Sequence, residues 1–117
     1  MKIKNAKIKN ATTRLDNKDR LIVSIEFHEA VTFSTFVFKL ANPVELGNFK
    51  KLMEFAEVTE LSELNGKIVR LAEHEDVILV AVGHPIEDRF VDVTNTMVNH
   101  IEEVTEAELL KDHSEGK

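Results

Sequence analysis

The first forty residues alternate between apolar and polar side chains, which predicts three β-strands. The alternation is loose over residues 2–15 and clear over residues 21–27, where Leu21, Val23, Ile25 and Phe27 share one face. Residues 31–40 are rich in Phe, Val and Thr, which favour strands. Polar residues 16–19 and the short stretch 28–30 separate these runs. We therefore expect an antiparallel meander of three strands.

The pattern then changes to a helical period. Asn42 can cap the first turn of a helix, Pro43 suits its first position and Glu45 favours its dipole. We expect this helix to run to about residue 58. The side chains predicted to face the sheet are Leu46, Phe49, Met53 and Ala56, and those predicted to face water are Lys50, Lys51, Glu54 and Glu57.

A second hairpin is predicted after one further turn at residues 60–64, which Asn65 and Gly66 end. Its strands are residues 67–72 and 77–83, joined around residues 73–76. Residues 77–82 are apolar on both faces, so we expect that strand to be central in the sheet.

The last third of the chain is predicted to hold a more charged strand over residues 86–93 and helical segments. Thr94 or Asn95 can cap a helix that carries Met97, Ile101 and Val104, and Thr105 with Glu108 forms a second capping pattern before a short terminal turn. The fold class predicted is α+β: an antiparallel sheet of about five to six strands with two hairpins, one main helix and a C-terminal helix.

Length and composition indicate one soluble domain over residues 1–117, with a frayed tail from about residue 112. No Pro/Gly/Ser-rich linker divides the chain. The longest apolar stretches, residues 30–38 and 77–86, are about half the length of a membrane-spanning helix. There is no Cys and no secretory signal pattern, so we expect a cytoplasmic protein.

Charge is distributed unevenly. Residues 1–20 carry seven Lys/Arg and two Asp, whereas residues 21–117 carry eight Lys/Arg and nineteen Asp/Glu. An acidic body of this kind disfavours direct nucleic-acid binding and favours a basic protein partner. The alternative is that the acids simply form solvated faces. The predicted partner-binding residues are Glu54, Glu57, Glu60, Glu63, Glu102, Glu103, Glu106 and Glu108.

Residues able to catalyse a reaction are not apparent in the sequence. Ser24 and Ser34 lie in predicted strands, Ser62 and Ser114 lack neighbouring glycines, and the glycines are too scattered for a phosphate-binding loop. We therefore expect that the protein is not an enzyme.

Two predicted hairpin turns contain histidine followed by glutamate. His28, Glu29, His74 and Glu75 together make a ligand set that zinc accepts without cysteine, so a structural zinc site is one hypothesis. The alternative is that these are solvated turn residues. His84 follows Gly83, where a hydrogen bond that orders the next turn is the favoured role.

Two segments carry a resemblance to other proteins. Residues 66–70 read Gly-Lys-Ile-Val-Arg, and residues 81–90 read Ala-Val-Gly-His-Pro-Ile-Glu-Asp-Arg-Phe. With the start Met-Lys-Ile-Lys-Asn-Ala and residues 52–56 (Leu-Met-Glu-Phe-Ala), they resemble small phage and prophage accessory proteins of uncharacterised function. Pro85 departs from that pattern, as does Phe90, where tryptophan is usual.

The resemblance implies a temperate-phage accessory protein in the cytosol of a bacterial host. Small acidic phage proteins include anti-CRISPR proteins, so the expected function is stoichiometric binding to a Cas9-like effector, with target DNA excluded and a metal stiffening the acidic surface. Two alternatives are a phage DNA replication or recombination accessory protein, with the basic first strand near DNA, and a sponge for a nucleotide signal.

Overall fold

The computed structural model describes residues 1–74, 78–94 and 102–113. Its six strands form one antiparallel sheet in the order β3-β2-β1-β4-β5-β6. The strands are β1 (Lys2–Leu15), β2 (Leu21–His28), β3 (Phe33–Lys39), β4 (Ile68–His74), β5 (Ile78–Gly83) and β6 (Phe90–Asp92). The helices are α1 (Pro43–Phe55), the 3₁₀ helix η1 (Leu61–Leu64) and α2 (Glu106–Asp112). The predicted α+β class, the two hairpins and both helices are confirmed.

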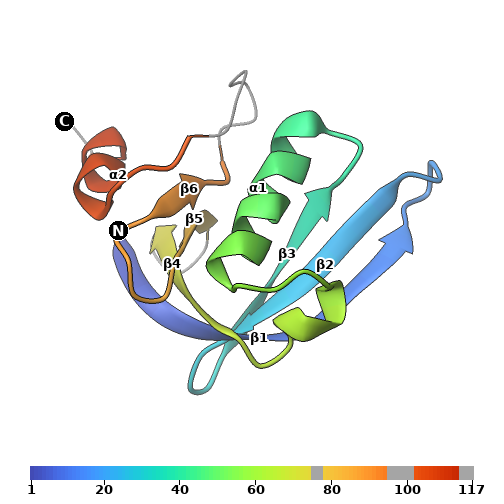
Figure 1. Cartoon of the computed structure of the whole chain (residues 1–117), viewed down its shortest axis with the longest axis horizontal. Helices are drawn as coiled ribbons and strands as arrows, with labels where there is room; N and C mark the ends of the chain where they lie inside the picture. Colours follow the sequence, from blue (N-terminus) through green and yellow to red (C-terminus); the bar gives the residue numbers. More distant parts are fainter. Residues whose placement is uncertain (75–77, 95–101, 114–117) are drawn as a thin grey trace.

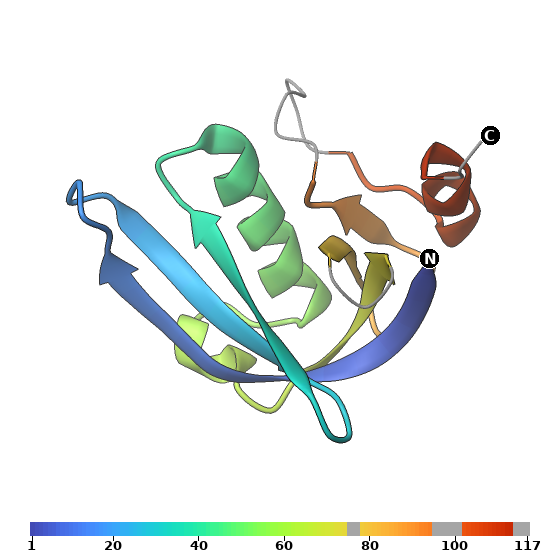
Figure 2. The ribbon, with the colours of Figure 1, turned by 180° about the vertical axis from the view of Figure 1, so that it is seen from behind.

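The long strand β1 gives the sheet its curl. Its first part pairs with β4 and its second part with β2, and the register with β2 shifts between Lys9 and Thr12, where Asn10 has a φ of 52°. An irregularity of this kind bends a strand and increases its twist. Gly66 and Lys67 bond to Ile8 on the side of β1 that faces away from β2. The sheet therefore wraps around α1, as Figures 1 and 2 show.

Helix α1 begins as predicted, and most of its predicted core face is confirmed. Asn42 Oδ1 accepts hydrogen bonds from the backbone N–H groups of Val44 and Glu45. Ala56 is buried, and Phe49 and Met53 are partly buried against the core, whereas Leu46 is exposed. The centre of the contact also includes Asn48, Leu52 and Phe55, which the prediction did not name.

The half of the sheet around β5 is buried on both faces. Leu71, Val82 and Val91 pack toward α1, while Ala81 and Phe90 pack with Leu109 of α2 on the opposite face. This explains the continuous apolar run predicted for β5. The prediction that this strand is central in the sheet was wrong. β5 lies between β4 and β6, which places it next to the edge strand.

The segment before α2 is partly extended. Of the helix predicted to carry Met97, Ile101 and Val104, residues 95–101 lie outside the described residues, and Val104 forms an antiparallel bridge with Phe90 instead of a helical turn. The second capping pattern is confirmed, since Thr105 and Glu108 cap α2 reciprocally. Within the described ranges, no helix has the length and apolar character needed to cross a membrane.

Candidate protein-binding face

The loop between β5 and β6 is organised around the imidazole of His84. This buried side chain accepts hydrogen bonds at Nδ1 from the backbone N–H groups of Ile86 (3.1 Å) and Glu87 (2.9 Å). Its own backbone N–H donates to the carbonyl of Arg89 at 2.9 Å, which closes the loop. The predicted role of His84 in ordering the following turn is confirmed.

The two segments that carry the resemblance meet at this loop. Arg70 of β4 donates from Nε to the carbonyl of His84 at 2.9 Å and from Nη2 to the carbonyl of Glu87 at 2.6 Å. Its guanidinium carbon lies 4.9 Å from the centre of the Phe90 ring, and that ring packs directly over Gly83. Residues of the two segments therefore hold this loop in place through hydrogen bonds and ring packing.

Replacing His84 tests this organisation. We expect His84→Ala to lower the free energy of unfolding by about 2 kcal/mol, because two backbone N–H groups lose their acceptor. His84→Asn should recover part of the loss, since an asparagine oxygen can accept bonds from backbone N–H groups two and three residues ahead. Chemical denaturation of both variants measures the difference, and equal losses would argue against the acceptor role.

Arg89 joins acidic groups that are far apart in the sequence. It donates to Glu54 of α1 at 2.6 Å, to Glu87 at 3.0 Å and to Glu103 at 2.8 and 2.9 Å. Lys51 of α1 donates to Glu103 at 2.7 Å. Glu54 and Glu103, which are far apart in the sequence, are thus linked through the cations Arg89 and Lys51.

Hydrogen bonds from Arg89, with a further contribution from Lys51, lower the pKa of Glu103 to about 2. The folded-state pKa is depressed, so the stabilisation is present above the pKa of the unfolded chain, about 4.5, and is lost as the pH falls toward 2. The same contacts raise the pKa values of Arg89 and Lys51.

Glu103→Gln tests this linkage. The wild type should lose about 1 kcal/mol more than the variant between about pH 6 and pH 2, a value reduced for solvent screening of a partly exposed pair. Denaturant unfolding across this pH range measures the difference. Parallel stability curves for the two proteins would show that Glu103 gains nothing from its ion pairs.

The C-terminal end of α1 adds a further acid in an unusual conformation. Glu57 has a φ of 59°, its N–H bonds to the Glu54 carbonyl, and the N–H of Val58 bonds to the Met53 carbonyl. This is a Schellman ending, in which glycine normally occupies the position of Glu57. The last turn of α1 contains no basic residue.

A cavity of about 260 Å³ lies between this helix end and the loop. Phe55, Glu57, Pro85 and Ile86 are among its lining residues. Ile86 is 84% exposed, so an apolar side chain projects into solvent beside the acidic groups.

We define the acidic face by six acids and the two bases among them. The acids are Glu54, Glu57, Glu87, Asp88, Glu102 and Glu103, and the bases are Lys51 and Arg89. Of the other predicted partner-binding residues, Glu60 and Glu63 cap η1, whereas Glu106 and Glu108 begin α2. The N–H of Glu106 donates to Asp88 Oδ1 at 2.6 Å, so the start of α2 adjoins the acidic face, whereas η1 lies on the other side of α1 in Figures 1 and 2.

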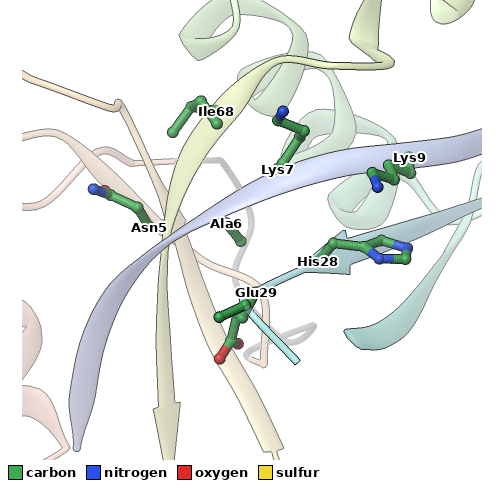
Figure 3. Close-up of a pocket in the computed structure, with 8 residues that line it drawn as sticks. Asn5, Ala6, Lys7, Lys9, His28, Glu29 and Ile68 are labelled. Carbon is green, nitrogen blue, oxygen red and sulfur yellow. The ribbon is translucent and has the colours of Figure 1, made fainter. Parts of the chain in front are cut away.

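The predicted zinc ligands on β2 have other partners. His28 Nε2 lies 2.8 Å from Glu26 Oε1, and its ring stacks on Phe33 at 4.7 Å. The Glu29 carboxylate lies 2.8 Å from Lys4 Nζ. Figure 3 shows His28 and Glu29 pointing in different directions at a cavity of about 340 Å³ that Lys7 and Lys9 also line.

The register does not bring His74 to this place. Lys7 pairs with His28 and Lys2 pairs with Glu73, so the two histidines are about 20 Å apart along β1. The His74 ring instead lies 6.0 Å from His113. Glu75 lies outside the described residues, and the described part of the chain contains no group of three or more His, Asp or Glu that could hold a metal ion.

Sequence reasoning missed the residues that organise this face. Lys51 was predicted only as a solvated helix residue, and Arg89, Glu87 and Ile86 were noticed only within the resemblance. A signal did exist, because residues 84–89 place three consecutive charged residues directly after Ile86.

Comparisons with protein-family models, with curated proteins and with solved structures find no match for this chain. The protein is therefore described by its structure alone. It is a small α+β domain in which a curled antiparallel sheet surrounds one helix, with an acidic face beside the β5–β6 loop.

Proposed function

We propose that the protein acts by stoichiometric binding of a basic protein partner through the acidic face. The observation that carries this proposal is Glu57. A glutamate at this position is unfavourable twice, because its left-handed conformation suits glycine and its negative charge lies at the negative end of the α1 dipole. Residues that cost stability in this way are concentrated at functional sites.

The surroundings of Glu57 fit an interface. The Arg89 network holds Glu54 and Glu103 in fixed positions, so less side-chain freedom is lost when a partner binds. Ile86 offers an apolar contact at the rim of the cavity. Acidic groups around it would attract basic partners and accelerate their association.

The specific partner we propose is a Cas9-like effector, with the protein acting as a phage anti-CRISPR inhibitor. This step rests on the resemblance of residues 66–70 and 81–90 to phage accessory proteins and on the acidity of the face. An acidic surface can occupy a basic channel that otherwise receives nucleic acid. The mechanism is competition for that channel, without a chemical step.

Glu57→Gly separates function from stability. We expect the free energy of unfolding to rise by about 1 kcal/mol, because glycine adopts the left-handed conformation readily and the charge at the helix end is removed. Affinity for the partner should fall at the same time. A variant that is less stable than the wild type, or one that binds equally well, would remove the main support for the proposal.

The two alternative functions predict different binding. A DNA replication or recombination accessory protein should shift single-stranded DNA in a gel, and a nucleotide sponge should melt at a higher temperature when the nucleotide is added. Binding to a loaded effector that weakens with rising salt favours the proposed function over both.

A further inference from the structure

The sheet has an open backbone edge at β3. The sheet order places β3 at one end and β6 at the other. At the β6 end, Val104 covers the edge by exchanging two backbone hydrogen bonds of 2.9 Å with Phe90. Among the residues that the structure describes, β3 pairs only with β2 (Figure 2). An unpaired edge is a template for another strand.

The outward-facing groups of β3 follow from its bonds to β2. Glu29 N–H donates to the Thr32 carbonyl, and Leu40 N–H donates to the Leu21 carbonyl. Both contacts mark hydrogen-bonded pairs, which recur at every second position of an antiparallel ladder. The intervening residues therefore point their N–H and C=O groups away from β2. These residues are Phe33, Thr35, Val37 and Lys39. The N–H of Lys39 already donates to Glu45 Oε1 and its carbonyl accepts from the N–H of Asn42, so the open part of the edge is Phe33, Thr35 and Val37.

From Phe33 to Val37 the β3 edge lacks the features that normally prevent edge-to-edge pairing, whereas the Glu45 side chain covers its end at Lys39. It contains no proline, its register with β2 runs without a bulge, and Lys39 at its end is its only charged residue. Phe33 is 57% exposed. In contrast, the part of β1 that β2 does not reach carries Lys2 and Lys4.

The hydrophobic core also reaches the surface at this edge. Phe36 packs edge-on against Phe38 with a centroid distance of 4.8 Å, and Phe38 lies 5.6 Å from Phe49. Phe38 is fully buried, whereas Phe36 and Phe49 are only partly buried. A further strand added to β3 would complete the burial of this aromatic cluster.

We propose that β3 pairs antiparallel with β3 of a second copy of this chain, which joins the two sheets about a two-fold axis at Phe36. In this register Thr35 lies opposite Val37 of the second copy, and these pairs supply the backbone hydrogen bonds between the copies. Phe33 lies opposite Lys39, whose backbone groups stay bonded to Glu45 and Asn42. Phe36 meets its own counterpart. In a chain with a net charge of −6, β3 contains no acid, and it is self-complementary about the two-fold axis. The proposal does not depend on the acidic face.

Sedimentation equilibrium of the full chain over a range of concentrations tests the proposal. The wild type should show a reversible monomer–dimer equilibrium. Thr35→Pro should raise the dimer dissociation constant at least about tenfold, because it removes an outward N–H and places a ring at the edge without breaking a bond to β2.

Asn5→Pro is the matched control. The backbone groups of Ile8 bond to Gly66 and Lys67 on the β4 side of β1. Because N–H directions alternate along a strand, the N–H of Asn5 points to the opposite side of β1, at the part of the strand that β2 does not reach. This variant should dimerise like the wild type. If Thr35→Pro does not fold, Thr35→Lys places a charge at the same edge and should weaken the dimer similarly. A wild type that is monomeric at every concentration, or equal weakening by Asn5→Pro, would overturn the proposal.

Discussion

Gly83→Ala should lower the free energy of unfolding by about 3 kcal/mol. A methyl group added at Gly83 would overlap the Phe90 ring and approach its Cγ at 3.1 Å. Both residues are fully buried, and the ring is also held by Arg70 and by packing against α2. The ring cannot move aside without disturbing the bridge between Phe90 and Val104, so we expect loss of both the loop and the α2 contact.

A double-mutant cycle isolates this contact. Phe90→Leu alone removes part of the ring at a cost of about 1 to 2 kcal/mol. In the Gly83→Ala background the same change should cost much less, or restore stability, because the smaller side chain leaves room for the methyl group. Additive losses in urea unfolding would show that the close approach of Gly83 and Phe90 is not the cause.

Glu57→Lys should weaken binding to a guide-loaded Cas9-like effector at least about tenfold at low salt. The substitution reverses the charge of Glu57, which lines the cavity at the end of α1, and it leaves the hydrogen bonds of Arg89 to Glu54, Glu87 and Glu103 in place. Because exposed charges are screened by salt, the difference between variant and wild type should shrink as ionic strength rises. Titration calorimetry or surface plasmon resonance at two salt concentrations measures this.

Asp19→Lys provides the control for charge and backbone. Asp19 is exposed, has the same positive φ of 59° as Glu57 and lies in the β1–β2 turn. The two variants change the net charge equally. If Asp19→Lys weakens binding as much as Glu57→Lys, then overall charge rather than the acidic face determines affinity.

Local sequence signals predicted most of the fold. Period-two alternation and turn residues located the strands, and the Asn42–Pro43 start located α1, because these signals act within a few residues. The core face of α1 was predicted in part, because Phe49, Met53 and Ala56 pack on the core but Leu46 is exposed. The curl of the sheet was not predicted, because it depends on the irregularity after Lys9, which apolar periodicity does not reveal.

The site was less predictable than the fold. Glu54 and Arg89 are 35 residues apart, and their contact requires the loop after β5 to lie beside the end of α1. The excess of acids was visible in the sequence, but the sequence analysis did not show that Glu63 is used to cap η1. The His28 and His74 turns looked equivalent in sequence, yet the pairing of β1 with both β2 and β4 separates them.

Titration of the purified protein against target-DNA cleavage by a guide-loaded Cas9-like nuclease tests the central claim most directly. We predict complete inhibition near one molecule of protein per effector, and relief of inhibition by added salt or by Glu57→Lys. Inhibition that continues at a small fraction of the effector concentration would indicate turnover and contradict the account. The absence of any binding would contradict it equally.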